Sequence, residues 1–278
     1  MSAPSLDTRH LDLRIVPTAE VLLHERTDPE RVRRLTTALL DANVLRNPPV
    51  VAQIEDGRFV VLDGATRTTA IRELGINHIL VQVVDYGHNV DLNTWHHLLR
   101  PRAYETVIQA LSRLPNADVV ECSVEETHAL LTTKGAAAAV ASADGRAFAL
   151  STHSHAQTAE LLCNLVDLYG GFGEIYRIAN EDLDVAIRAS DDVRGVVLFP
   201  LWTPADIIAA ATTPSLLPAG ITRHGIHGRA LNVNLSLDML SISAGLESKR
   251  EWLDAWLRKK MTARKVRYYH EAVFLFDD

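Results

Sequence analysis

One junction between an apolar segment and a helical segment constrains the fold of this chain most strongly. Phe59–Leu62 is apolar and β-rich, Asp63-Gly64 follows it, and a helical pattern begins at Ala65. The first amides of a helix have no acceptor inside the helix and point outward, so they suit a phosphate. Gly64 allows a close approach to the backbone, and Arg67 can add a bidentate contact. The junction therefore predicts an anion site; a plain strand-turn-helix connection with an exposed arginine is the alternative.

Composition limits the class of protein. The chain has 278 residues, of which 47% are hydrophobic and 23% charged, which is ordinary for a globular protein of about two domains. Its net charge of −7 argues against a general nucleic-acid binder, whose surface is usually basic. Cys122 and Cys163 lie far apart and form no C-x-x-C pair, and we expect a reducing cytoplasm. Neither a signal core nor an apolar run of membrane-spanning length is present, so we expect no membrane association.

The first ninety or so residues predict a compact unit of strands and helices. Asp28-Pro29-Glu30 has the residues of a helix N-terminus, since Asp is a good N-cap and Pro suits the first helical position. Asp56-Gly57 predicts a hairpin between Val50–Glu55 and Phe59–Leu62. Together with strands at Arg14–Leu23 and Ile79–Val84, these segments indicate a βαββαβ unit.

Beyond Pro101 the pattern still mixes strands and helices, and we place a domain boundary there, with domains at residues 1–100 and 101–278. Ala230–Leu237 alternates as a strand, Glu247–Thr262 is an amphipathic helix, and Val266–Phe276 is a final strand. The fold class expected from these segments is α+β.

Three further segments carry residues suited to chemistry. Glu25 lies on a turn between a strand and a helix, where catalytic groups gather, although a lone solvated glutamate is the plainer interpretation. Trp95 follows the last strand of the first unit, where a tryptophan is most often a core or interdomain packing residue. A glycine-punctuated loop contains Thr222, Arg223 and His224, and its arginine could hold a carboxylate or a phosphate; an exposed connection is the alternative.

The C-terminal segment is basic, with Lys249, Arg250, Arg258, Lys259, Lys260, Arg264, Lys265 and Arg267. Apolar residues alternate with these charges at helical spacing, which favours a solvated amphipathic helix over nucleic-acid contact.

Taken together, the motifs resemble a known family. The first hundred or so residues are similar to the ParB/sulfiredoxin-like fold, and within it the chain most resembles the free L-serine kinases, including those of siderophore clusters. Four segments carry the resemblance: Leu23-His24-Glu25, Asp63-Gly64-Ala65-Thr66-Arg67, Asn93-Thr94-Trp95-His96 and Ile221-Thr222-Arg223-His224 followed by Asn232.

The same segments separate this chain from relatives. Sulfiredoxins have a reactive cysteine where this chain has Ala65, and partition-type ParB proteins continue into a helical DNA-binding region that has no counterpart here. The serine kinases usually have histidine before the motif arginine, whereas this chain has Thr66. Threonine can donate a hydrogen bond to a phosphate but carries no positive charge, so the choice between ATP and ADP is left open.

The resemblance implies a fold and a reaction. It implies a ParB/sulfiredoxin-like N-terminal domain, a mixed α/β C-terminal domain and an active site in a cleft between them. It implies transfer of a phosphoryl group from ATP or ADP, with Mg²⁺, to free L-serine, giving O-phospho-L-serine. The roles it implies are a catalytic base at Glu25; Asp63 on the metal or the hydroxyl; nucleotide contacts from Gly64, Ala65, Thr66, Arg67 and Thr68; and serine contacts from Trp95, Thr222, Arg223 and His224.

Two other functions compete with this expectation. A nucleotide-responsive, ParB-like DNA-binding regulator would use the basic C-terminal helix, and the net charge counts against it. A protein that binds nucleotide without transferring phosphate is the other. L-threonine as substrate, the metal ligands, the pathway and the oligomeric state are left open.

Overall fold

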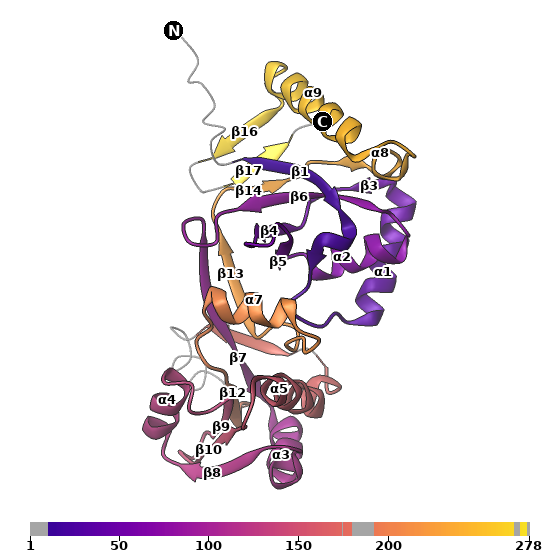
Figure 1. The fold of residues 1–278 in the computed structure, drawn as a ribbon. Helices are drawn as coiled ribbons and strands as arrows, with labels where there is room; N and C mark the ends of the chain where they lie inside the picture. Colours follow the sequence, from indigo (N-terminus) through magenta and orange to yellow (C-terminus); the bar gives the residue numbers. More distant parts are fainter. Residues whose placement is uncertain (1–10, 174, 180–191, 270–272, 277–278) are drawn as a thin grey trace. The chain divides into compact units, whose positions relative to one another are not determined.

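The computed structural model of the protein describes residues 11–173, 175–179, 192–269 and 273–276. These residues form two compact units, which we call unit 1 and unit 2. Unit 1 contains the residues up to Asp91 and those from His224 onward, and unit 2 contains Leu92–Arg223. The chain enters unit 2 within strand β7 (Val90–Leu99) and leaves it within β13 (Thr222–Ile226) (Figure 1).

Unit 1 is built on a five-stranded sheet with the order β1-β6-β4-β5-β2. Its strands are β1 (Asp12–Pro17), β2 (Val21–Leu22), β4 (Val50–Gln53), β5 (Phe59–Asp63) and β6 (His78–Val84). β4 and β5 form the hairpin that was predicted around Asp56-Gly57. β6 lies antiparallel to β1 and parallel to β4, so it occupies the interior of the sheet and is almost entirely buried.

Two helices pack against each other beside this sheet, α1 (Pro29–Ala42) and α2 (Ala65–Glu73) (Figure 1). α1 begins as the sequence predicts, because the Asp28 side chain accepts hydrogen bonds from the amides of Glu30 and Arg31. Such a cap stabilises a helix by about 1 kcal/mol. A one-turn 3₁₀ helix, η2 (Thr18–Glu20), links β1 to β2.

The C-terminal part of the chain completes unit 1 rather than a second domain. Its elements are β14 (Arg229–Leu231), β15 (Leu235–Ser236), α8 (Leu237–Ser241), α9 (Leu246–Thr262), β16 (Val266–Tyr269) and β17 (Val273–Phe276). β15 pairs with β3 (Val44–Leu45) of the N-terminal part, and buried Val233 and Leu253 join the same core as Ile15. The predicted domains 1–100 and 101–278 differ from these units, because pairings between distant segments leave no trace in local patterns.

Unit 2 is built on a second sheet with the order β11-β7-β12-β9-β10-β8, in which β13 also pairs with β7. Its further strands are β8 (Asp118–Cys122), β9 (Ala138–Ser142), β10 (Ala147–Ser151), β11 (Tyr176–Ala179) and β12 (Gly195–Leu198). Its helices are α3 (Pro101–Ala110), the 3₁₀ turn η3 (Leu111–Arg113), α4 (Val124–Thr132), α5 (His155–Gly170) and α7 (Pro204–Thr212). α3 packs on α5, and α4 packs on the β9–β10 hairpin (Figure 1).

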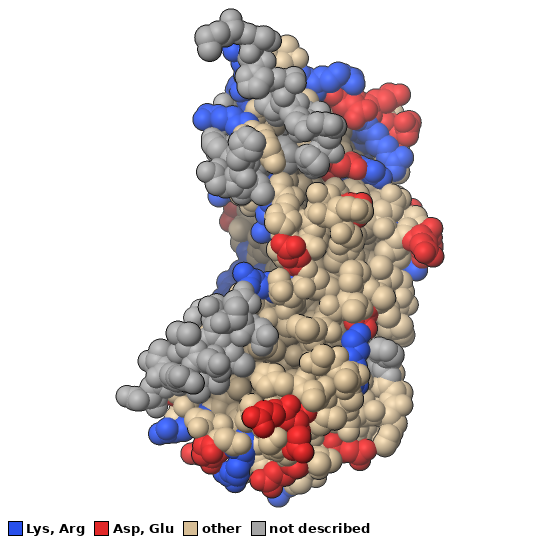
Figure 2. Space-filling model, turned by 90° about the vertical axis from the view of Figure 1, so that its left-hand side faces the viewer, with Lys and Arg blue, Asp and Glu red and all other residues tan. Residues whose placement is uncertain are grey.

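The described surface carries charges of both signs. In the view of Figure 2 most of it is uncharged, and basic and acidic side chains are interspersed. On the basic helix α9, Lys249 is buried and donates a hydrogen bond to the Leu240 carbonyl, so this lysine is structural. Among the described residues, no helix combines the length and the apolar character needed to cross a membrane.

Candidate functional site

The predicted junction is a tight turn from β5 into α2. Asp63 ends the strand, and Gly64 is the N-cap of the helix with φ +99°. A Cβ on Gly64 would lie 2.7 Å from Arg67 Nη2 and 3.1 Å from Pro49 Cα. The backbone angle and the lack of space both require glycine here. The helix therefore opens with its first amides uncovered by any side-chain cap, as the anion-site prediction needs.

Two arginines share the Asp63 carboxylate. Arg67 Nη2 and Arg229 Nη2 both contact Asp63 Oδ2, and Arg229 is the first residue of β14 in the C-terminal part of unit 1. Burial would raise the pKa of the Asp63 carboxyl, but the charges of Arg67 and Arg229 outweigh burial and hold this pKa below its usual value. Asp63 is thus a carboxylate that is bound by two guanidinium groups. Because its pKa is low, it is a poor general base.

A cavity of about 700 Å³ opens beside the junction in unit 1. Glu25, from the turn after β2, lines it together with Asp63, Gly64, Ala65, Thr66 and Arg67. The structure therefore brings together the predicted base and most of the predicted nucleotide contacts. The rest of the wall is largely apolar and comes from α1 and β3, and it consists of Leu35, Ala38, Leu39, Ala42, Val44 and Leu45.

Two residues of this cavity wall were missed by sequence reasoning. Arg46 and Asn47 line the cavity from the loop after β3. The C-terminal part holds this loop, because Asn234 N donates to the Arg46 carbonyl at 3.1 Å and Asn232 N donates to Asn47 Oδ1 at 2.8 Å. Only the Asn47-Pro48-Pro49 break marked the loop in the sequence, and it indicates a turn rather than a site.

Thr68 is separated from the other predicted nucleotide contacts. It is fully buried, and its hydroxyl donates to the Gly64 carbonyl at 3.1 Å. Because it lies one helical turn after Gly64, on the face that packs into the core with Ile71, it offers nothing to a ligand in the cavity.

His224 lies in unit 1 and is enclosed by other rings. Its Nε2 is 2.8 Å from the Tyr86 hydroxyl, and its ring meets the His24 ring edge-on with centroids 5.4 Å apart. His24 is itself fixed, since its Nδ1 is 2.7 Å from the Val61 carbonyl oxygen. Burial lowers the pKa of His224 to about 3, so the imidazole is neutral at physiological pH. Sequence reasoning missed Tyr86, whose only signal is its place in the Asp85-Tyr86-Gly87 turn.

Three of the predicted serine contacts lie in unit 2. The Arg223 guanidinium lies over the Trp95 ring, 4.7 Å from its centroid, and Trp95 N donates to the Ile221 carbonyl at 3.1 Å. Thr222 is buried. The loop and the tryptophan of the predicted motifs therefore meet, and the Arg223 guanidinium is held in a cation–π stack.

Buried polar groups of unit 2 support this loop. His97 Nδ1 is 2.7 Å from the Tyr169 hydroxyl, and His97 Nε2 is 3.0 Å from the Gly220 carbonyl oxygen, two residues before Thr222. Burial lowers the pKa of His97 to about 4, so His97 is neutral and donates from one ring nitrogen only. The adjacent His96 accepts a hydrogen bond from the Phe199 amide, so neither histidine is directed at a metal.

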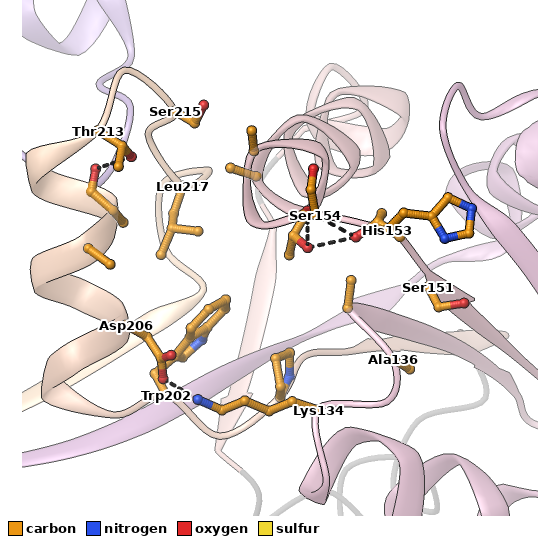
Figure 3. Close-up of a pocket in the computed structure, with 18 of the residues that line it drawn as sticks. Lys134, Ala136, Ser151, His153, Ser154, Trp202, Asp206, Thr213, Ser215 and Leu217 are labelled. Carbon is orange, nitrogen blue, oxygen red and sulfur yellow. Dashed lines mark hydrogen bonds and ion pairs between the residues drawn. The ribbon is translucent and has the colours of Figure 1, made fainter.

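A second cavity, of about 500 Å³, lies within unit 2 (Figure 3). Lys134 and Asp206 form an ion pair at 2.5 Å on its wall, and Ser154 caps α5 beside it. The predicted site residues do not line it, and the buried Trp202 Nε1 on its wall has no hydrogen-bond partner among the described residues. Across the described part of the chain, no group of three His, Cys, Asp or Glu residues is arranged to hold a metal ion.

Comparisons with known proteins concern the whole chain. No protein-family model matches the chain. It is 26% identical to "ATP-dependent L-serine kinase SbnI" of Staphylococcus aureus in an alignment that covers 96% of this chain and 98% of that protein. The chain is similar to an L-serine kinase along nearly its whole length. An "ATP-dependent L-serine kinase" of Staphylothermus marinus is 28% identical over 111 residues, 39% of this chain and 41% of that protein.

Solved structures show the same fold. A C-terminally truncated SbnI from Staphylococcus aureus superposes with a TM-score of 0.70 at 23% identity, covering 92% of this chain and 99% of that one. A free serine kinase in complex with AMP gives a TM-score of 0.70 at 16% identity, covering 86% and 98%. The resemblance to the serine kinases and the α+β fold class are thereby confirmed.

Proposed function

We propose that this protein is a kinase that phosphorylates the hydroxyl group of free L-serine and yields O-phospho-L-serine. The observation that carries the proposal is the cavity of unit 1, where Glu25 lines the same wall as the uncapped N-terminus of α2. The whole-length similarity to a protein named as an ATP-dependent L-serine kinase supports it. The comparisons do not support the DNA-binding regulator that the basic C-terminal helix left open.

The junction suits the phosphates of a nucleotide donor. Gly64, Ala65, Thr66 and Arg67 line the cavity at the uncapped start of α2, which suits phosphates, and the apolar wall from α1 and β3 suits a base. The names of the relatives favour ATP as donor, and one solved neighbour is a free serine kinase in complex with ADP. We keep both donors in the proposal.

Magnesium would reach this site mainly through the nucleotide. Mg²⁺ usually keeps several waters and binds phosphate oxygens with one or two carboxylates, and when bound it neutralises charge on the phosphates. Asp63 fits poorly as its ligand, because both arginines occupy Asp63 Oδ2. Glu25 is the other carboxylate of the cavity wall. We therefore assign the metal to the donor phosphates rather than to a protein cage.

Glu25 serves as the general base in this proposal. The serine oxygen forms a bond to the terminal phosphorus, the bond from that phosphorus to the bridging oxygen breaks, and the hydroxyl proton passes to the Glu25 carboxylate. General-base assistance of this kind is typically worth about 10²–10⁴-fold in rate. Asp63, which the sequence suggested as a second catalytic carboxylate, holds the two arginines instead.

The loop before β13 and the start of that strand supply the serine contacts. We assign the amino-acid carboxylate to Arg223, which stacks on Trp95, and we keep His224, a neutral imidazole bonded to Tyr86, as a predicted serine contact. L-threonine is included as a second substrate in the proposal, because one extra methyl group is a weak discriminator.

The proposal is tested by phosphorus NMR. The full chain is incubated with L-serine, Mg²⁺ and either ATP or ADP, and we expect O-phosphoserine with at least one donor. Glu25→Gln should lower kcat by about 10²–10⁴-fold. Glu55→Gln, which changes an exposed glutamate on the β4–β5 turn, is the matched control and should keep wild-type kcat. Absence of product with both donors, or full activity in Glu25→Gln, would overturn the mechanism.

A further inference from the structure

A buried side chain holds the backbone on both sides of Arg229. Arg229 begins β14, and the fully buried Gln82 side chain of β6 bonds to the backbone on both sides of it. Gln82 Nε2 donates to the Gly228 carbonyl at 2.8 Å, and Gln82 Oε1 accepts from the Ala230 amide at 2.8 Å. A buried amide with both ends satisfied is a rigid support, so the Arg229 backbone is fixed against the central sheet.

The Arg229 side chain uses this position to reach Asp63. Its guanidinium meets the same Asp63 oxygen that Arg67 contacts. One carboxylate and two guanidinium groups leave a net charge of +1 at the junction. Without Arg229, Asp63 and Arg67 would form a neutral pair, and the attraction for an anion would fall.

Arg67 is incompletely satisfied in its present position. Its Nε is buried and has no hydrogen-bond partner among the described residues. Its guanidinium lies close against Gly64, at the start of the helix whose amides are uncapped. An orphaned donor beside an anion site indicates a side chain that gains contacts when an anion arrives.

We infer that Arg229 is a positioning residue. It stays bound to the Asp63 carboxylate when Arg67 leaves Asp63 and binds the donor phosphates. The inference rests on the proposed function. A partly buried carboxylate left without a partner is costly, so Arg67 can leave Asp63 only if another cation stays. Arg229, fixed through Gln82, is that cation.

The test measures ADP affinity by calorimetry on the full chain. Arg229→Gln should weaken ADP binding by about 10- to 100-fold, the value of a hydrogen bond to a charged group. Arg229→Lys should recover part of this loss, because a lysine keeps the charge but not the planar fork. Arg58→Gln is the matched control, since Arg58 pairs with Asp56 on the β4–β5 turn of the same unit and should keep wild-type affinity.

A double-mutant cycle separates positioning from direct contact. In an Asp63→Asn background there is no carboxylate to hold, so adding Arg229→Gln should cost much less ADP affinity than the same change costs in the wild type, and only the longer-range effect of one lost charge should remain. A full additional loss in that background would mean that Arg229 contacts the phosphates itself, and it would overturn the inference. Thermal unfolding of each variant shows whether a loss of affinity comes from a loss of fold.

Failure of the inference is distinguishable from failure of the proposed function. Wild-type ADP affinity in Arg229→Gln, with serine phosphorylation intact, would overturn the role of Arg229 and leave the kinase standing. A wild-type chain that neither binds ADP nor phosphorylates serine would overturn the kinase and the inference with it.

Discussion

Residues that lie far from His224 in the sequence bury its imidazole and keep it neutral. Tyr86 precedes β7 and His24 follows β2, yet both rings contact His224. Together they bury the imidazole and keep it uncharged. A neutral imidazole whose Nε2 is bonded to a hydroxyl presents its other nitrogen in a defined orientation, which a substrate-binding residue requires.

Removing the Tyr86 hydroxyl tests this arrangement. Tyr86→Phe should raise KM for L-serine by about 2- to 10-fold, the value of one hydrogen bond, and leave ADP affinity unchanged. Tyr104→Phe removes a tyrosine hydroxyl bonded to Ser142 in unit 2 and is the control. Steady-state kinetics with L-serine as the varied substrate gives the answer, and an unchanged KM in Tyr86→Phe would show that the hydroxyl does not orient His224.

The residues found from the sequence are those that lie in short motifs. Glu25, Asp63 and Arg67 sit beside turn and cap signals, and the structure places all three on one cavity. Arg229 and Tyr86 contact segments that are distant in the sequence, so local patterns do not reveal their roles. Thr68 was assigned from its closeness to the motif, although its spacing from Gly64 turns it into the core.

The turn from β5 into α2 combines a strained backbone angle with a crowded position, and the two effects can be separated. Gly64→Ala adds a Cβ both at φ +99° and 2.7 Å from Arg67 Nη2. We expect a loss of about 1–3 kcal/mol in the free energy of unfolding from the backbone angle, and weaker ADP binding because Arg67 and the turn must shift.

Gly57→Ala is the matched control for this prediction. Gly57 has φ +89° on the β4–β5 turn, and a Cβ there would meet nothing within 4 Å. It should lose stability to a similar extent and bind ADP as the wild type does. Urea denaturation and calorimetry on both variants are the measurements, and equal ADP affinity in the two would show that the space above Gly64 is not part of the site.

The start of α1 was predicted well, and three strands were not. The N-cap Asp28 behaves as expected, since the cap is decided by residues within one turn. The predicted strand Arg14–Leu23 is broken by η2 into β1 and β2. The predicted strand Ala230–Leu237 is interrupted, because Asn232 and Asn234 adopt φ of 54° and 53° and end the alternation. The predicted strand Val266–Phe276 is two antiparallel strands, β16 and β17, and residues 270–272 between them lie outside the described residues.

The stability of the protein should depend on pH through its buried neutral histidines. Burial lowers the pKa of His97 to about 4, against an ordinary value of 6.5. Between these two pH values the unfolded chain binds a proton that the folded chain excludes, so stability is lost as the pH falls below 6.5. One such group changes the free energy of unfolding by at most about 1.4 kcal/mol per pH unit.

His97→Gln should make this dependence shallower. Urea denaturation of the full chain at pH 7 and pH 5 is the measurement, and the variant should lose less stability between the two than the wild type. Thr94→Val is the control, because Thr94 is a buried, non-titrating residue of the same strand that donates to the Pro200 carbonyl. Relative to the wild type, Thr94→Val should lower the free energy of unfolding by the same amount at pH 7 and at pH 5. An unchanged difference in His97→Gln would show that this imidazole does not carry the effect.

The division into units was the part of the fold that the sequence could not supply. The boundary predicted at Pro101 lies ten residues after Asp91, where the chain leaves unit 1 for unit 2. The return of the chain at His224 has no mark in the local sequence pattern, because it depends on β15 pairing with β3, and the paired Leu45 and Leu235 are far apart in the sequence.

This discontinuity sets an order for biosynthesis. All of unit 2 has been synthesised once Arg223 has left the ribosome, whereas unit 1 still lacks β14, β15 and α9. The N-terminal part of unit 1 therefore keeps an apolar face uncovered while unit 2 folds. This reverses the usual order, in which N-terminal domains fold first. A chain arrested near residue 223 would expose the surface that Val233 and Leu253 normally cover and would be a natural client for chaperones.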